Sequence, residues 1–211
     1  MDSIRVVSFD LEGTSVTPDL SQAVWHEGIP SLYATENSID FEEARAIVLR
    51  EYQRVGDQRK EWYDIKYWFN LFGLGDYRKV LERYKDKLSH FPDVLPVLSS
   101  LGVRYRLIIA TGTAREFLPY LLDGLESHFV KVFSSISDYG QLKSPQFYTQ
   151  VCKEMGVQPF EMIHVGDSRR FDFVAANEAG INVFHLKRNQ ESGNGDSLKS
   201  LTELDTRLQR R

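Results

Sequence analysis

Apolar residues gather in five short runs along the chain, and none of the runs alternates strictly between apolar and polar positions. The runs lie at residues 4–10, 105–111, 130–133, 162–166 and 181–185. Continuous apolar runs of this length are typical of strands that are covered on both faces, whereas half-exposed strands alternate. The pattern therefore predicts five buried strands.

Helical patterns separate most of these strands. The patterns and their end signals are, in order, 114–125 with Thr113 as N-cap, 146–155 with Ser144 as N-cap, and 169–179 closed by Gly180. Strands that alternate with helices favour parallel pairing through right-handed crossovers. We therefore expect an α/β fold with a doubly wound, mostly parallel, five-stranded sheet.

One connection is far longer than a crossover needs, because about eighty residues separate Thr14 from Pro92. Apolar residues recur in this connection at the three- and four-residue spacing of helices, over 41–55, 59–72 and 76–88. The sequence thus predicts a helical insert at 18–89 on an α/β core built from 1–17 and 90–211.

The end of the chain carries two further signals. Residues 187–197 are polar and rich in glycine, which predicts a surface loop, and 197–204 has the spacing of a final amphipathic helix.

Composition narrows the class of protein without deciding its chemistry. The 211 residues are 42% hydrophobic and 27% charged, with a net charge of -4, as in an ordinary globular protein. This balance argues against nucleic-acid and membrane partners. The single cysteine, Cys152, excludes an internal disulfide and is expected to be a buried structural thiol. Because no signal peptide or membrane-spanning run is visible, we expect a cytoplasmic location.

Polar residues with chemical potential follow the predicted strands. Asp10 ends the first strand and is followed by a turn at Gly13 and Thr14. In open α/β sheets the ligand crevice lies at the carboxyl ends of the strands, so Asp10 would reach it. A carboxylate there can attack phosphorus and form a covalent intermediate, or it can merely cap the turn.

Further polar residues fall at the ends of the other strands. Thr111 follows the second strand and Lys143 precedes a helix after the third, while Asp167 and Asp172 follow the fourth. Two carboxylates that face Asp10 would repel one another unless a cation lay between them. Hard oxygen ligands suit Mg²⁺.

The order and spacing of these motifs resemble the haloacid dehalogenase-like (HAD) phosphohydrolases. The resemblance rests on Asp10-Leu11-Glu12-Gly13-Thr14, Thr111, Lys143, and Gly166-Asp167-Ser168 followed by Asp172. It covers the whole chain, and it implies a Rossmann-like core, a C1-type cap at 18–89 and a Mg²⁺ cofactor.

The resemblance also implies a role for each motif. Asp10 would be the nucleophile, Glu12 the general acid and base, and Thr111, Gly112 and Lys143 the phosphate-binding groups. The metal ligands would be Asp10, the backbone carbonyl of Glu12, Asp167 and Asp172, with Asp172 acting directly or through water or Lys143.

Glu12 departs from the Asp that most phosphatases of the family carry there. The enolase-phosphatase branch also has Glu, but the Gly166-Asp167-Ser168 motif has the general family form. The sequence therefore predicts a Mg²⁺-dependent phosphatase for a small phosphorylated metabolite. It leaves open an altered reaction, such as a phosphomutase or a dehalogenase, and a weakly active binding scaffold.

The insert is rich in aromatic residues, namely Trp25, Tyr33, Trp62, Tyr63, Tyr67, Trp68, Phe69, Phe72 and Tyr77. These rings can pack the insert, form a dimer contact or line a wall for an organic leaving group. Both a monomer and a homodimer are compatible with this composition. The insert has no dense basic cluster, so we do not expect a polyanionic substrate.

Overall fold

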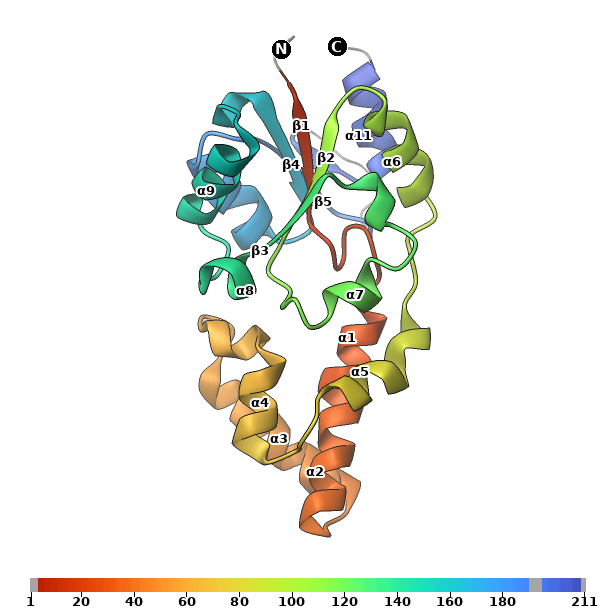
Figure 1. Ribbon diagram of the computed structural model, residues 1–211, viewed down its shortest axis with the longest axis vertical. Helices are drawn as coiled ribbons and strands as arrows, with labels where there is room; N and C mark the ends of the chain where they lie inside the picture. Colours follow the sequence, from red (N-terminus) through yellow and green to blue (C-terminus); the bar gives the residue numbers. More distant parts are fainter. Residues whose placement is uncertain (1–3, 190–194, 210–211) are drawn as a thin grey trace.

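The computed structural model describes residues 4–189 and 195–209, and within these ranges the core is a six-stranded parallel sheet in the order β3-β2-β1-β4-β5-β6 (Figure 1). The strands are β1 (Val6–Phe9), β2 (Arg106–Thr111), β3 (Lys131–Ser134), β4 (Met162–Gly166), β5 (Asn182–Leu186) and β6 (Ser197–Leu198). The doubly wound α/β fold and its five expected strands are confirmed, and a short sixth strand extends one edge.

Both faces of the sheet are covered, which explains the continuous apolar runs. Val7 and Phe9 of β1 belong to one hydrophobic cluster, while Val6, whose side chain points to the opposite face of the sheet, belongs to the other. Helices α6 and α11 pack on the first face, and α9 and α10 on the second (Figure 1). Their bounds, with those of the two short helices near the site, are α6 (Val94–Gly102), α7 (Leu118–Leu121), α8 (Ser135–Tyr139), α9 (Pro145–Met155), α10 (Ala175–Glu178) and α11 (Leu201–Gln209).

The helix expected at 146–155 forms as predicted. The Ser144 side chain accepts a hydrogen bond from the Phe147 amide at 3.2 Å, and Pro145 occupies the first turn, where its missing N–H costs nothing. Cys152 of this helix is buried, and burial raises the pKa of its thiol to about 11. The expectation of a structural thiol is thus confirmed.

The helix expected at 114–125 is wrong for most of its length. Only α7 is α-helical there, since residues 114–117 make tight turns with i→i+3 hydrogen bonds. Pro119 cannot donate to the carbonyl four residues earlier, and Gly124 at φ 75° ends the segment. Thr113, expected as the N-cap, makes a different contact that is described below.

Two other helical segments differ in detail from the sequence pattern. Helical structure at 169–179 begins with a wide π-helical turn, Arg169–Val174, before α10, and it closes at Gly180 as expected. At 197–204 the helix starts later, because the Lys187 amide donates to the Leu198 carbonyl at 2.7 Å and draws these residues into β6. Part of the loop expected at 187–197 lies outside the described residues.

Helices alone make up the regular structure between residues 18 and 89 in the described chain, and they stand apart from the sheet at one end of the molecule (Figure 1). The α-helices are α1 (Asp19–Ala23), α2 (Ile29–Asn37), α3 (Phe41–Val55), α4 (Ile65–Phe72) and α5 (Arg78–Tyr84), with a π-helical segment at Val24–Gly28 and 3₁₀ turns at Lys60–Tyr63 and Lys85–Lys87. The helix expected at 59–72 is interrupted at Asp64, whose side chain caps α4 by accepting from the Lys66 and Tyr67 amides.

The two edges of this insert lie side by side. The Thr17 amide donates to the Ser89 carbonyl at 2.8 Å, and Val16 forms an isolated antiparallel bridge with His90. Both linkers therefore leave and re-enter the core at one place.

Most of the insert's aromatic rings serve its own packing. Trp68 is fully buried against Tyr52, with ring centroids 4.6 Å apart, and Tyr33 meets Phe72 edge to face at 5.3 Å. Trp25, Trp62 and Tyr63 are instead half-buried and face the core. None of the helices in the described ranges is long and apolar enough to cross a membrane.

Candidate active site

The candidate site lies at the carboxyl ends of the central strands, as the sequence predicts. Asp10 follows β1, and its amide donates to the Val165 carbonyl of β4 at 2.9 Å, so the sheet itself fixes its backbone. The Ser15 hydroxyl donates to the Asp10 carbonyl at 3.0 Å from the turn that follows. Thr111 ends β2 beside it and is also buried. Asp10 and Thr111 therefore lie side by side at the carboxyl-terminal edge of the sheet.

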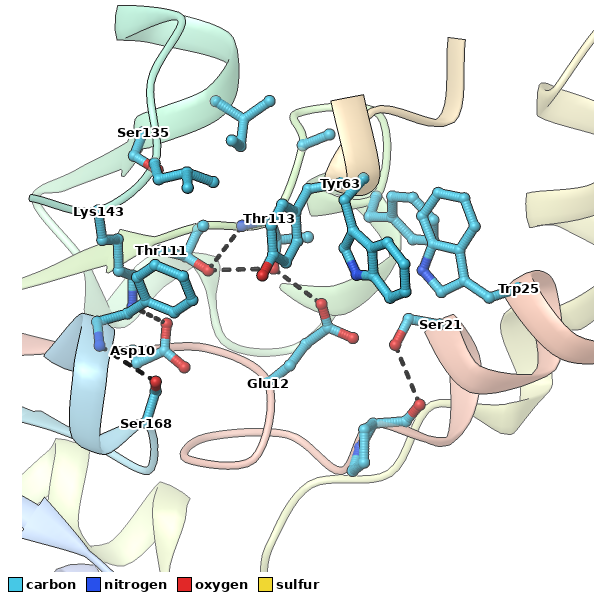
Figure 2. Close-up of a pocket in the computed structure, with 18 of the residues that line it drawn as sticks. Asp10, Glu12, Ser21, Trp25, Tyr63, Thr111, Thr113, Ser135, Lys143 and Ser168 are labelled. Carbon is cyan, nitrogen blue, oxygen red and sulfur yellow. Dashed lines mark hydrogen bonds and ion pairs between the residues drawn. The ribbon is translucent and has the colours of Figure 1, made fainter. Parts of the chain in front are cut away.

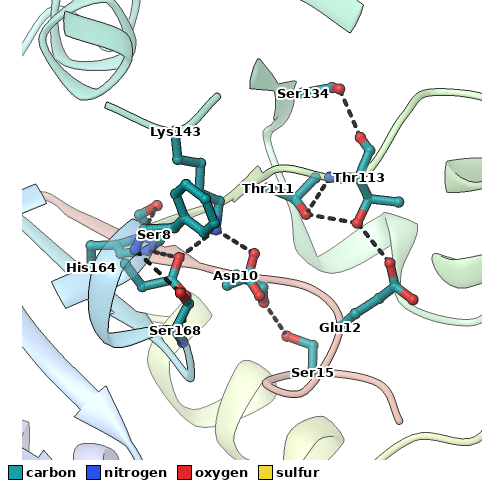
Figure 3. A network of polar contacts seen from close by, with 12 residues as sticks. Ser8, Asp10, Glu12, Ser15, Thr111, Thr113, Ser134, Lys143, His164 and Ser168 are labelled. Carbon is teal, nitrogen blue, oxygen red and sulfur yellow. Dashed lines mark hydrogen bonds and ion pairs between the residues drawn. The ribbon is translucent and has the colours of Figure 1, made fainter. Parts of the chain in front are cut away.

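Lys143 joins two of the carboxylates (Figure 3). Its Nζ donates to Asp10 Oδ1 at 2.5 Å and also to Asp172 Oδ1, and all three side chains are buried. Lys143 can take this position because it directly precedes the Ser144 cap of α9. The lysine expected from its place after the third strand therefore lies in the site.

The charges of this trio are strongly coupled. Burial raises the pKa of Asp10 to about 8, although Lys143 opposes the shift. Burial alone would also raise the pKa of Asp172, but Lys143 and His164 outweigh it and hold that pKa below its ordinary value. Burial lowers the pKa of Lys143, while the two carboxylates more than reverse that effect and keep it charged. The site as it stands carries more carboxylates than cations.

A third carboxylate completes a possible metal site. Among the residues with described positions, Asp10, Asp167 and Asp172 each place one carboxylate oxygen within 4.8 Å of the others. Asp167 is the most exposed of the three, but neighbouring atoms still desolvate its carboxyl group, and this desolvation together with the charge of Asp172 raises its pKa. A hard divalent cation would offset the mutual repulsion of these three carboxylates, so the donor set fits such an ion.

Two glycines allow this close approach. A side chain at Gly13, which has φ 78°, would collide with the Asp167 carboxylate, and one at Gly166 would collide with Asp172. The glycines of both motifs are therefore required by the packing of the carboxylates and not only by the turns.

The side chain of Glu12 turns away from the carboxylate cluster toward the loop after β2 (Figure 3). Its Oε2 accepts a hydrogen bond from Thr113 Oγ1 at 2.8 Å, and Thr111 Oγ1 donates to Thr113 Oγ1 at 3.1 Å. Within the described residues, Glu12 Oε1 is buried without a hydrogen-bond partner. Burial raises the pKa of Glu12, while the Ser21 and Thr113 side chains oppose the shift.

The sequence did not reveal Thr113 as the partner of Glu12, because a Thr before a helical pattern is normally a cap.

The sequence also did not reveal the role of Tyr148, whose hydroxyl lies 3.0 Å from His164 Nε2 and 3.4 Å from Asp172 Oδ1. His164 is a fully buried histidine of β4 that contacts Asp172 at 3.2 Å and Ser8 at 2.9 Å. Burial lowers its pKa and favours the neutral ring. The position of Asp172 is therefore fixed from two sides.

A cavity of about 330 Å³ opens from these polar groups toward the insert. Figure 2 shows Asp10, Glu12, Thr111 and Lys143 on the core side and Trp25 and Tyr63 entering from the insert. Gly112 also lines the cavity, beside Thr111. The Lys66 ammonium lies 2.7 Å from the Glu116 carboxylate and joins the insert to the core near the cavity. The site thus lies between the insert and the core.

Known proteins share both the sequence pattern and the fold. The sequence model of the haloacid dehalogenase-like hydrolases matches residues 4–180. Phosphoglycolate phosphatases of Chromobacterium violaceum and Vibrio vulnificus are each 28% identical to the chain, covering 84% and 87% of it and 82% and 83% of their own lengths. A HAD phosphatase from Thermococcus onnurineus superposes with a TM-score of 0.85 at 28% identity, with 97% of this chain and 98% of that chain covered.

The chain therefore belongs to the haloacid dehalogenase-like hydrolases, and the relatives confirm the expected phosphatase branch of the family. An L-2-haloacid dehalogenase from Xanthobacter autotrophicus also superposes, with a TM-score of 0.63 over 98% of both chains. At 19% identity this second likeness shows the shared fold alone.

Proposed function

We propose that this hydrolase is a Mg²⁺-dependent phosphatase that acts on a small phosphorylated metabolite through an aspartyl-phosphate at Asp10. The observation that carries the proposal is the buried contact of Lys143 with both Asp10 and Asp172, in the lining of a cavity between insert and core. A nucleophilic carboxylate next to a fixed ammonium is what phosphoryl transfer needs, since catalysis rests on positioning and charge neutralisation.

The first half of the reaction breaks the ester bond. An Asp10 carboxylate oxygen attacks phosphorus, the bond to the ester oxygen breaks, and Glu12 gives its proton to the departing alcohol. A raised pKa suits Glu12 for this step, because the acid must be protonated near neutral pH. Thr111 and Lys143, with the backbone at Gly112, hold the phosphoryl oxygens.

The second half releases phosphate. Water attacks the phosphorus of the aspartyl-phosphate, Glu12 accepts its proton, and the bond to Asp10 breaks to restore the carboxylate. The Thr113 hydroxyl keeps the Glu12 carboxylate on the side of the cavity where the leaving group stands. Glu is one methylene longer than the usual Asp, and this hydrogen bond to the loop after β2 takes up the extra length.

Asp10, Asp167, Asp172 and the backbone carbonyl of Glu12 would hold Mg²⁺. The bound ion would neutralise the phosphoryl oxygens and favour the ionised form of Asp10. Residues 18–89 are proposed as a C1-type cap on the core of 1–17 and 90–211, which agrees with the paired linkers at Thr17 and Ser89. Such a cap would exclude water while the ester bond breaks.

The proposal is tested by hydrolysis of p-nitrophenyl phosphate and acetyl phosphate, with Mg²⁺ and with EDTA. We expect Mg²⁺-dependent turnover by the wild type and none by Asp10→Asn. Glu12→Gln is expected to accumulate a phospho-enzyme that mass spectrometry detects as an addition to the Asp10 peptide. Turnover that persists in EDTA, or in Asp10→Asn, would contradict the proposal.

A further inference from the structure

The cavity wall opposite the catalytic groups is aromatic. Its rings come from the insert and from the core and belong to Trp25, Tyr52, Trp62, Tyr63, Phe117 and Phe171. Two ring pairs span the insert and the core, since Trp25 contacts Phe117 with centroids 5.5 Å apart and Tyr63 meets Phe171 edge to face at 6.3 Å. Because its rings come from both parts of the chain, the aromatic wall forms where the insert packs against the core.

Hydrogen bonds from two tyrosine hydroxyls of the insert hold the wall in place. The Tyr52 hydroxyl donates to the Trp25 carbonyl at 3.2 Å, and the Tyr63 hydroxyl donates to the Asp57 carbonyl at 3.3 Å. Tyr52 also packs edge to face on Trp62, with centroids 6.0 Å apart. Rings fixed in this way offer flat apolar surface at little cost in conformational entropy.

The same wall lacks positive charge. Of the lysines and arginines with described positions, only Lys143 lines the cavity, and its ammonium already contacts Asp10 and Asp172. The other basic residue of the lining, His26, is solvent-exposed. Arg170 stands nearby, but its guanidinium is exposed and lies over the Phe171 ring, 4.5 Å from the centroid.

Charge and shape together select among phosphate esters. The phosphoryl end of a substrate would meet Lys143 and the metal-binding carboxylates, whereas the rest of the lining offers aromatic rings and neutral hydroxyl groups but no further described lysine or arginine. A carboxylate on that leaving group would lose its hydration without gaining a counter-ion, and three acidic side chains already line the cavity, those of Asp10, Glu12 and Asp172.

We propose that the leaving group of the natural substrate is uncharged and apolar or aromatic, and that the enzyme discriminates against esters that carry a second anionic group. The inference rests on the proposed phosphatase function. It separates this chain from the phosphoglycolate phosphatases that it resembles, because the glycolate released by that reaction is a carboxylate.

The test compares benzyl phosphate with 4-carboxybenzyl phosphate, whose ester bonds are of similar intrinsic reactivity. We expect kcat/KM to be at least about tenfold higher for benzyl phosphate, a factor typical of one unpaired buried polar group. Phosphoglycolate is expected to be a poorer substrate than benzyl phosphate as well. Equal rates, or a preference for either carboxylated ester, would overturn the inference and leave the phosphatase function intact.

A variant supplies the missing charge. Tyr63→Arg places a guanidinium in the wall, and we expect it to reduce the ratio of the two kcat/KM values by at least about fivefold, since it offers the carboxylate a partner. Tyr63→Phe is the matched control, because it keeps the ring and should keep the preference. An unchanged ratio in Tyr63→Arg would contradict the role assigned to the wall.

A binding measurement separates the two proposals if turnover fails. Benzylphosphonate cannot be hydrolysed, and its binding beside Trp25 and Trp62 should quench tryptophan fluorescence. We expect its Kd to be at least about tenfold lower than that of 4-carboxybenzylphosphonate. Tight binding without hydrolysis of any ester, acetyl phosphate included, would reject the phosphatase and keep the apolar site. Equal binding of the two phosphonates would reject the apolar site.

Discussion

Glu12 and Thr113 are joined by a 2.8 Å hydrogen bond although 101 residues separate them in the chain. Each follows a strand of the neighbouring parallel pair β1 and β2, whose register brings the two loops together. The contact holds the longer acid of this chain at the edge of the cavity, and it makes Thr113 a positioning residue for the proton transfer proposed for Glu12.

Thr113→Val should lower kcat and leave KM nearly unchanged. The substitution removes the hydroxyl that donates to Glu12 Oε2 at 2.8 Å and keeps the volume of the side chain. We expect kcat to fall by about tenfold at pH 7, equivalent to about 1.4 kcal/mol of lost transition-state stabilisation, with KM within about twofold. Thr113→Ser should restore most of the rate. If Thr113→Val kept the kcat of the wild type, the hydrogen bond to Glu12 would have no role in catalysis.

Glu12→Gln should stabilise the fold at neutral pH more than at pH 4. Burial raises the pKa of Glu12 in the folded state, so the unfolded chain releases this proton first as the pH rises above 4.5. The folded state thus loses stability from that point up to its own raised pKa, and Gln removes this loss. Melting curves in EDTA should show a difference in Tm between variant and wild type that grows from pH 4 to pH 8. Each kcal/mol appears as about 2–4 °C in a chain of this size.

A Tm difference that stays constant or shrinks as the pH rises would contradict the raised pKa of Glu12. Glu203→Gln is a suitable control because this carboxylate lies on α11, far from the site in the fold, and accepts from the Lys199 amide at 3.0 Å.

Lys143→Met should destabilise the metal-free protein as well as abolish turnover. The substitution leaves Asp10 and Asp172 buried without their cation, and removal of one partner from a buried charge pair typically costs about 3–5 kcal/mol. We expect urea unfolding in EDTA to show a loss of this size that is smaller at pH 5, where the carboxyl groups can protonate. Mg²⁺ should restore part of the stability, since the carboxylates would then share another cation. A metal-free stability equal to that of the wild type would contradict the assigned charge balance.

Lys66→Met should loosen the contact between insert and core. The ammonium of Lys66 is half-exposed at the Glu116 carboxylate, so the ion pair is expected to contribute no more than about 1 kcal/mol. KM should rise by up to about fivefold, and high salt should raise the KM of the wild type toward that of the variant. Lys79→Met, an exposed position on α5, is the matched control for a lost surface charge. A KM that depends on salt equally in Lys66→Met and the wild type would rule out the ion pair as the cause.

Cys152 should react slowly with thiol reagents in the native protein. It is buried in α9, and burial raises the pKa of the thiol to about 11, so both access and ionisation are low at pH 8. Reaction with 5,5'-dithiobis(2-nitrobenzoate) should be complete within minutes in urea and at least about a hundredfold slower without it. Rapid labelling of the folded protein would contradict the buried position.

The sequence predicted the parts of the fold that depend on local patterns. Five apolar runs became strands because burial on both faces leaves no alternation, and the helix at α9 follows from Ser144 and Pro145 at its start. The predicted helix at 114–125 was wrong because the spacing of apolar residues carries no information on backbone hydrogen bonds, which Pro119 and Gly124 interrupt. The sequence did not predict the short strand β6, because its two residues are strand only through their pairing with β5.

The carboxylates, hydroxyl and lysine of the candidate site were also visible in the sequence, since each stands where a predicted strand or its loop ends. Their charge balance was not visible, because it depends on burial and on oxygen atoms brought within 4.8 Å of one another from separate loops. The partner of Glu12 and the aromatic wall were likewise decided by tertiary structure. Side chains distant in the chain meet there only after the sheet has set its register and the insert has folded over its edge, and the resulting loss of water fixes both their pKa values and the chemistry of the cavity.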